Sequence, residues 1–179
     1  KHVSRGGALV GICGGYQMLT DLISDPEGAE AGGEIRGMGL LHGETLFYGE
    51  KSRTRVTGVV QGAQGIFAGL NGAAFEGYEI HMGRTTGDIG FASLTRDGAS
   101  SPDGMAAGSV WGSYVHGIFD KGAFARAFVD CLLKAKGLEP AADVEDWESY
   151  KARQYDILAD GVRKALDMDQ IYRILEEGI

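Results

Sequence analysis

The spacing of hydrophobic residues changes at Cys13, near the start of the chain. An apolar run over residues 8–13 is typical of a buried strand. After Cys13 the apolar positions follow helical spacing, at Tyr16, Leu19, Leu22 and Ile23. We expect this helix to end before Asp25 and Pro26, because the residue before a proline disfavours helix. Cys13 is therefore predicted to lie at a sharp turn between a strand and a helix.

The middle of the chain has a β-like pattern. Residues 25–39 are acidic and rich in glycine, and we expect a flexible loop there. From residue 40 to 115, short runs of β-branched and aromatic residues alternate with glycine, and a helix is hard to place. Asp97-Gly98 and Asp103-Gly104 are turn signals. The predicted strands cover residues 44–48, 53–60, 74–81, 90–94 and 110–116.

The last part of the chain has a helical pattern. The first apolar stripe consists of Phe124, Phe128, Leu132 and Ala135, and the second of Trp147, Tyr150, Tyr155, Leu158, Val162 and Leu166. Gly137 and Pro140 end the first helix, and Asp167 with Gln170 resembles a capping box for a last one. Only one strand-helix unit suited to a parallel sheet is visible, so we expect the chain to be the C-terminal part of a longer domain.

Composition narrows the function classes. The 179 residues, 44% of them hydrophobic, can bury one core, and this length suggests one domain. A net charge of −8 argues against a protein that binds nucleic acid or anionic membranes, because such binding needs a basic surface. No apolar run approaches the roughly 20 residues of a membrane span, and no secretory signal opens the chain. A cytoplasmic location is the default expectation, with Cys13 and Cys131 as free thiols.

Cys13 is the first candidate for chemistry. Gly11, Gly14 and Gly15 permit positive φ and close approach of another molecule, as in a nucleophile elbow with sulfur in place of oxygen. The following helix would direct free N–H groups at the thiol, lowering its pKa and binding an oxyanion. The alternative is a small buried apolar cysteine.

A cysteine nucleophile needs a base, usually histidine. His2 and His42 are expected on the surface, whereas His81 and His116 end predicted strands just before glycine turns, where active-site residues collect. Spacing alone leaves both open. The carboxylates that could orient the base are Glu79, Asp103 and Asp120. Neither a zinc pattern nor a phosphate-binding loop is visible, so we expect no metal and no cofactor in this chain.

Three segments carry a resemblance to a known family. GICGGYQ at residues 11–17 resembles the nucleophile motif of class I (triad-type) glutamine amidotransferases. GYEIHMGRT at residues 77–85 and GSYVHGIFD at residues 112–120 resemble the amidotransferase domain of the cobyric acid synthase family, and weaker matches extend over nearly the whole chain. The resemblance implies an α/β, flavodoxin-like mixed sheet with flanking helices, lacking the N-terminal strands of the domain.

The resemblance also implies roles for single residues. Cys13 would attack the side-chain amide of glutamine, and His116 would serve as base and then as acid. The backbone N–H of Gly14 would be an oxyanion donor. The glutamine-binding residues would be Gln17, His81, Met82 and Gly83. Most class I enzymes carry a glutamate where this chain has Ile118, so the resemblance implies a Cys-His dyad.

The resemblance further implies partners. Residues 1–179 would be the C-terminal part of the amidotransferase domain, and an ATP-binding synthetase domain would precede it. ATP and Mg²⁺ would bind there, and the acceptor would be a corrinoid, adenosylcobyrinic acid a,c-diamide, whose peripheral carboxylates are amidated in cobalamin biosynthesis.

Three other interpretations stay open at this point. The first is an amidotransferase subunit for lipid-linked peptidoglycan precursors, which the GYEIHMG string disfavours. The second is a non-catalytic binding module of the same fold, against which the presence of both Cys13 and His116 argues. The third is a general cysteine hydrolase, which would have no preference for glutamine.

Overall fold

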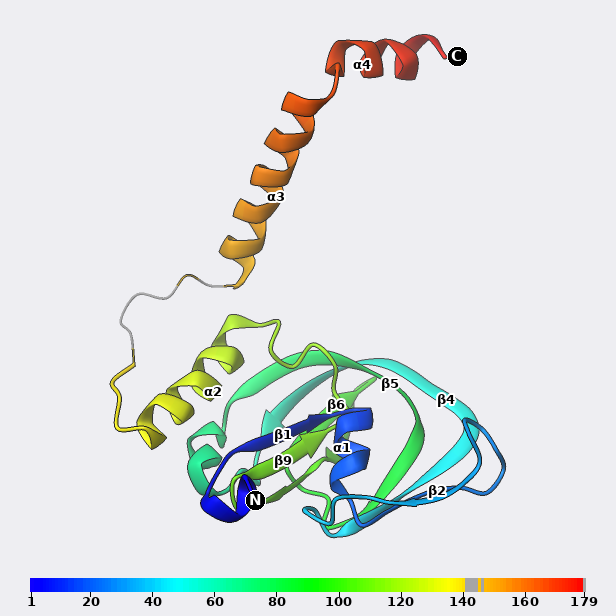
Figure 1. Ribbon diagram of the computed structural model, residues 1–179, viewed down its shortest axis with the longest axis vertical. Helices are drawn as coiled ribbons and strands as arrows, with labels where there is room; N and C mark the ends of the chain where they lie inside the picture. The colour runs from blue at the N-terminus through cyan, green and yellow to red at the C-terminus, as the bar shows by residue number, and fades with distance from the viewer. Residues whose placement is uncertain (141–144, 146, 179) are drawn as a thin grey trace. The chain divides into compact units, whose positions relative to one another are not determined.

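The computed structural model describes residues 1–140, 145 and 147–178, and for residues 50–52 it describes only the backbone. The chain divides into two compact units. The first is Lys1–Pro140, and the second contains the two helices nearest the C-terminus. Figure 1 labels the main elements along the chain.

Two mixed β-sheets form the frame of the first unit. Their strands are β1 (Leu9–Ile12), β2 (Leu22–Asp25), β3 (Gly33–Arg36), β4 (Gly43–Val60), β5 (Ala74–Gly87), β6 (Ala92–Arg96), β7 (Ala99–Asp103), β8 (Met105–Ala107) and β9 (Val110–Ser113). One sheet has the order β1-β9-β8, with β1 parallel to β9. The other has the order β3-β2-β4-β6-β7, and β5 pairs with β4. In Figure 1, β4 and β5 are the two long curved strands.

Helices complete both units. The α-helices are α1 (Gly14–Leu19), α2 (Gly122–Ala135), α3 (Trp147–Ala165) and α4 (Met168–Glu177), and the 3-10 helices are η1 (Val3–Arg5) and η2 (Gly65–Leu70). The α/β class expected from the sequence is confirmed, with α1 directly after a strand of a mixed sheet. In the described residues, no helix is long and apolar enough to cross a membrane.

Two glycines bring α1 close to the sheet. Gly11 of β1 and Gly112 of β9 are register partners. A Cβ on Gly112 would lie 2.3 Å from Cδ2 of the buried Tyr16, and a Cβ on Gly11 would lie 2.6 Å from the carbonyl oxygen of Gly15. Real Cβ atoms do not approach so closely, so the absence of side chains here permits the tight turn that carries Cys13.

An aromatic core packs on β9, the strand that pairs with β1. Trp111 of β9 stacks on Phe91, with ring centroids 4.4 Å apart, and contacts Phe124 of α2 edge to face. All three side chains are buried. The second cysteine, Cys131, is a buried free thiol on α2, and Cys13 is also free, as expected. The ring contact between Trp111 and Phe124 thus packs α2 against β9.

The two sheets are joined beside the candidate site. Tyr78 of β5 and His116 exchange backbone hydrogen bonds, with N–O distances of 3.0 Å and 2.8 Å. His116 follows β9, so this bridge ties the end of the three-stranded sheet to β5, which pairs with β4 in the six-stranded sheet. The segments that contain Cys13, His81 and His116 are thereby brought to one region.

The helix expected to reach residue 24 is shorter than predicted. It ends at Leu19, and the two apolar residues Leu22 and Ile23 belong to strand β2. Thr20 is extended, with ψ of 179°, and its hydroxyl donates to the carbonyl of Gln17 at 2.7 Å. Pairing of β2 with both β3 and β4 therefore overrides the helical spacing.

The β-rich middle region is confirmed, but its boundaries differ. The two strands predicted at residues 44–48 and 53–60 are one irregular strand, β4, and the third continues beyond residue 81 to Gly87. Strands β3, β7 and β8 were not predicted, since their residues read as loop and turn. Asp97 and Gly98 have φ of 48° and 83°, so this turn signal is confirmed between β6 and β7.

The helical pattern of the tail is confirmed. The predicted apolar stripes correspond to α2 and α3. Asp167 is the N-cap of α4, and its carboxylate accepts a hydrogen bond from the backbone N–H of Gln170 at 3.0 Å. The capping residue was thus correctly identified from local sequence, because a cap depends only on neighbouring residues.

Candidate active site

Cys13 lies at a strained turn between β1 and α1. Its φ of 53° and ψ of −114° are unfavourable for a residue with a side chain, whereas Gly11, Gly14 and Gly15 all have negative φ. The backbone N–H of Cys13 donates to the carbonyl of Ser113 at 2.9 Å, which continues the β1-β9 pairing into the turn. The strain therefore falls on the proposed nucleophile itself, as in a nucleophile elbow.

The surroundings of Cys13 favour the protonated thiol over the thiolate. Its Sγ donates to the carbonyl oxygen of Ile80 on β5 at 3.6 Å. Burial raises the pKa of Cys13, and the backbone N–H of Gly14 lowers it by a smaller amount. The sequence-based expectation of a lowered pKa is therefore wrong for the free protein, because α1 is short and desolvation dominates. A base is needed to remove this proton.

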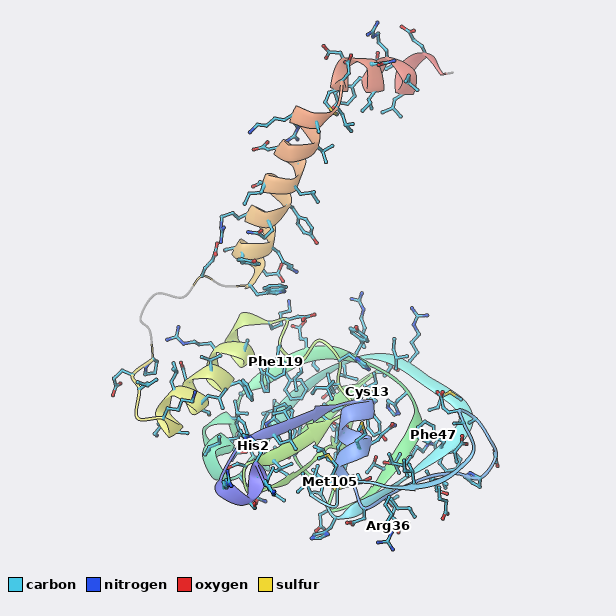
Figure 2. All side chains as sticks on the ribbon, viewed as in Figure 1. His2, Cys13, Arg36, Phe47, Met105 and Phe119 are labelled. Atoms are coloured by element: carbon cyan, nitrogen blue, oxygen red, sulfur yellow. The ribbon has the colours of Figure 1, made fainter. Side chains whose placement is uncertain are left out.

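Cys13 opens into a cavity of about 400 Å³. Of the residues to which the sequence assigns roles, five line it: Cys13, Gly14, Gln17, His81 and Met82. In Figure 2, Cys13 is labelled beside α1 and Phe47, another lining residue, on β4. The structure thus brings the proposed nucleophile, oxyanion donor and glutamine-binding residues together, while their roles stay predictions.

Gly83 is not among the residues that line the cavity, but it packs against Gln17, which is. The side chain of Gln17 is 7% exposed, and its Nε2 donates to the hydroxyl of Tyr114 at 3.4 Å. A Cβ on Gly83 would lie 2.5 Å from that Nε2 atom. A glycine is therefore required at position 83 if Gln17 is to keep this orientation.

His81 forms a wall of the cavity. Its Nδ1 lies 2.7 Å from the carbonyl oxygen of Gly83, and its ring stacks on that of Tyr114 with centroids 3.8 Å apart. Its Nε2 lies 3.6 Å from a carboxylate oxygen of Glu79. Nδ1 is thus engaged by the Gly83 carbonyl, whereas Nε2 is buried without a hydrogen-bond partner among the described residues.

His116 stands outside the residues that line the cavity. Its ring is parallel to that of Tyr78, with centroids 5.3 Å apart. Its Nε2 atom is buried and has no hydrogen-bond partner among the described residues. In the tautomer that carries the ring proton on Nδ1, this Nε2 has a lone pair that can accept a proton. The pairing of Cys13 with His116 stays a prediction.

The three candidate carboxylates have different surroundings. Glu79 pairs with Arg96. Asp103 accepts a hydrogen bond from the hydroxyl of Ser113 at 2.6 Å, and burial raises its pKa. Asp120 lies beside Gly117, where a Cβ would be 3.0 Å from its Oδ2 atom. Asp103 thus supports the end of β9, the strand that leads to His116, through a serine.

Three lining residues had been given no role by sequence reasoning: Glu30, Phe47 and Ile80. Glu30 belongs to the acidic segment expected to be a flexible loop, yet Asp25 accepts hydrogen bonds there from the N–H groups of Ala29, Glu30 and Gly32 at 2.7–2.8 Å. The Asp-Pro at residues 25–26 could have indicated an ordered turn, but nothing local places it at Cys13.

The two remaining histidines are surface residues, as expected. His2 and His42 are exposed, and His42 lies 3.5 Å from Asp21. Within the described residues, no group of three or more potential ligand side chains is arranged to hold a metal ion.

Comparison with known proteins adds a family. The profile of the CobB/CobQ-like glutamine amidotransferase domain matches residues 1–124. A cobyric acid synthase of Ruminiclostridium cellulolyticum is 48% identical over 187 residues, covering 100% of this chain and 36% of that protein. One of Lachnoclostridium phytofermentans is 39% identical over 193 residues, covering 100% and 38%. The chain thus spans a little over a third of the length of these curated relatives.

Proposed function

The chain belongs to the family of CobB/CobQ-like glutamine amidotransferase domains, and we propose that it releases ammonia from glutamine as the amidotransferase part of a cobyric acid synthase. The single observation that carries this proposal is the position of Cys13. It lies at a strained elbow and opens into a cavity that Gly14, Gln17, His81 and Met82 also line. A nucleophile, an oxyanion donor and a binding wall are the parts that amide hydrolysis requires.

The proposed reaction proceeds through a thioester. His116 takes the proton of Cys13, and Sγ attacks the side-chain carbonyl carbon of glutamine. The backbone N–H of Gly14 donates to the resulting oxyanion. The carbon–nitrogen bond then breaks as His116 returns the proton to the departing nitrogen, which leaves as ammonia. Water, deprotonated by His116, hydrolyses the thioester to glutamate and restores the thiol.

The raised pKa of Cys13 supports a role for a base. A thiol that is protonated in the free protein cannot attack until its proton is removed. Nε2 of both histidines has no hydrogen-bond partner in the described part of the chain, but Nδ1 of His81 lies 2.7 Å from the carbonyl oxygen of Gly83 and His81 lines the cavity. These contacts support His81 as a part of the binding wall, and the resemblance of the segment GSYVHGIFD to the family motif supports His116 as the base.

The remainder of the activity belongs to parts outside these 179 residues. In this proposal an upstream synthetase domain binds ATP and Mg²⁺ and uses the ammonia to amidate peripheral carboxylates of adenosylcobyrinic acid a,c-diamide. The relatives named above support this acceptor over a peptidoglycan precursor. A cytoplasmic location is part of the same proposal.

Covalent labelling tests the proposal directly. The full-length protein is exposed to a glutamine-like chloroketone, digested, and mapped by mass spectrometry. We expect an adduct on Cys13 that glutamine prevents, and no adduct on the buried Cys131, whose pKa is also raised by burial. Absence of the Cys13 adduct, or equal labelling of both cysteines, would contradict the proposal and favour a binding module.

A further inference from the structure

A buried carboxylate and a buried hydroxyl form a pair where β9 ends. Asp103 is 4% exposed, and Ser113, the last residue of β9, is 0% exposed. The hydroxyl of Ser113 donates to Oδ2 of Asp103 at 2.6 Å, and the backbone N–H of Tyr114 donates to Oδ1 at 3.5 Å. Because a buried carboxylate that loses its donors is costly, this pair holds the hydroxyl of Ser113 in one orientation.

The same hydroxyl supports the segment that leads to His116. Its oxygen accepts a hydrogen bond from the backbone N–H of Val115 at 3.0 Å. Since β9 ends at Ser113, the serine side chain provides an acceptor for the chain just beyond the strand. His116 is the next residue, and its own backbone N–H donates to the carbonyl of Tyr78 on β5 at 2.8 Å. These two bonds fix consecutive peptide groups at the approach to His116.

The main chain of Ser113 supports the turn at Cys13. Its carbonyl oxygen accepts a hydrogen bond from the backbone N–H of Cys13 at 2.9 Å. Cys13 has a φ of 53°, and a strained conformation of this kind persists only where the surrounding contacts impose it. Ser113 therefore contacts both the turn that carries the proposed nucleophile and the segment that carries the proposed base.

We propose that Ser113, oriented by Asp103, is a positioning residue that holds the segment of His116 in place relative to the turn of Cys13. Neither Ser113 nor Asp103 lines the cavity, so both act through the backbone and not by touching glutamine. Proton transfer between a thiol and an imidazole requires a defined separation, and an error of about 1 Å can cost roughly 10²-fold in rate. The kinetic part of this inference rests on the proposed function.

The variant Ser113→Ala tests this role, because it removes the hydroxyl and keeps the carbonyl that accepts from Cys13. We expect kcat for ammonia release by the full-length protein to fall roughly 10- to 100-fold. The KM for glutamine should change less than about threefold, since Tyr114, which stacks on His81, keeps its hydrogen bond to Asp103. A merely structural hydroxyl would change the folded fraction, which thermal denaturation measures, without separating the two constants.

The matched control is Ser109→Ala, just before the other end of β9. Ser109 also offers its carbonyl to β1, where it accepts from the backbone N–H of Leu9 at 3.1 Å. Its hydroxyl oxygen likewise accepts from a backbone N–H, that of Ile66, at 3.4 Å. This substitution removes the same group beside the same strand but at the end opposite to Ser113, so both kinetic constants should equal those of the wild type.

Amide hydrogen exchange in the full-length protein tests the contact without any activity. In the wild type we expect the backbone amide of Val115 to exchange roughly 10²-fold or more slowly than in an unfolded peptide. Ser113→Ala should accelerate this exchange, whereas Ser109→Ala should not. Fast exchange at Val115 in the wild-type protein would overturn the inference, whether or not any variant folds.

The contribution of Asp103 is tested by Asp103→Asn. This substitution keeps the shape of the side chain but replaces one accepting oxygen with a donating nitrogen. We expect kcat to fall in the same direction as in Ser113→Ala. A wild-type kcat in folded Asp103→Asn would refute the role of the carboxylate.

The outcomes separate the two proposals. A wild-type protein without glutaminase activity would refute the proposed function and leave hydrogen exchange as the test of the contacts of Ser113. An active, folded Ser113→Ala variant with an unchanged kcat, or with a raised KM as its main effect, would refute the positioning role while leaving the proposed function intact.

Discussion

The thiol of Cys13 donates a hydrogen bond to the carbonyl oxygen of Ile80, 67 residues away in the sequence. Cys13 follows a strand of the three-stranded sheet, and Ile80 belongs to β5 of the other sheet. The candidate site is therefore assembled across two sheets. Since Ile80 directly precedes His81, this contact also places the thiol beside the proposed binding wall.

Two substitutions of Cys13 separate its chemistry from its backbone strain. Both Cys13→Ser and Cys13→Gly should lower ammonia release by roughly 10³-fold or more, as expected for loss of a nucleophile. The free energy of unfolding of Cys13→Ser should equal that of the wild type. That of Cys13→Gly should be about 1 kcal/mol higher, because glycine relieves the strain of the positive φ. Urea denaturation measures this difference, and loss of folding in Cys13→Ser would restore the interpretation as a structural cysteine.

Substitution of the two histidines should affect different kinetic constants. His116→Ala should lower kcat by roughly 10²-fold or more, the usual contribution of a general base. His81→Ala should mainly raise the KM for glutamine, because the ring supports the binding wall. Steady-state ammonia release measures both constants. The reverse pattern, with His81→Ala costing more turnover, would move the role of base to His81.

Glu30 is the carboxylate that lines the cavity, and we expect it to contact the α-ammonium group of glutamine. Glu30→Gln should raise the KM for glutamine roughly tenfold, since hydrogen bonds between charged groups are the stronger ones. The same substitution should leave kcat/KM unchanged for a second substrate, a glutamine analogue that lacks the α-amino group. Glu27→Gln, an exposed change in the same loop, is the control. An equal loss with both substrates would contradict an ammonium contact.

The buried carboxylate of Glu79 predicts a pH dependence of stability. Burial by itself raises its pKa, but contacts with His81 and Arg96 outweigh burial and lower that pKa from 4.5 to about 2. A group with a lowered folded-state pKa contributes stability above its unfolded value, and that contribution is lost as the pH falls through the folded one. We expect the free energy of unfolding to fall more between pH 4.5 and 2 in the wild type than in Glu79→Gln. Parallel curves would contradict this assignment.

Packing of α1 on the sheet gives a prediction about stability. Gly112→Ala would place a Cβ 2.3 Å from the ring of Tyr16 and should cost about 1–3 kcal/mol, the usual effect of overpacking. Activity should also fall, because the displaced helix carries the turn at Cys13. Gly90→Ala is the control, since no atom lies within 4 Å of the added Cβ there. Equal stability of the two variants would show that α1 accommodates the methyl group.

Features that depend on neighbouring residues were predictable. The turn at Cys13, the stripe of α2 and the cap of α4 at Asp167 each follow from a few consecutive positions. The grouping of Gln17 with His81 at Cys13 was expected only through the resemblance of their motifs to a family. Spacing alone could not choose between His81 and His116.

Features that depend on distant partners were decided only in the folded chain. The helical spacing through Leu22 was overridden by strands that pair with β2 from elsewhere in the sequence. The sequence predicted only that Glu30 lies in a loop. Its position at the cavity depends on Asp25, whose carboxylate accepts a hydrogen bond from the backbone N–H of Glu30. Likewise, Glu79 is buried in an ion pair with Arg96, and this pair forms only because β5 and β6 both pair with β4 in the folded chain. Local sequence determines backbone preference and the chemical groups available, whereas burial and pairing across the two sheets determine which groups meet.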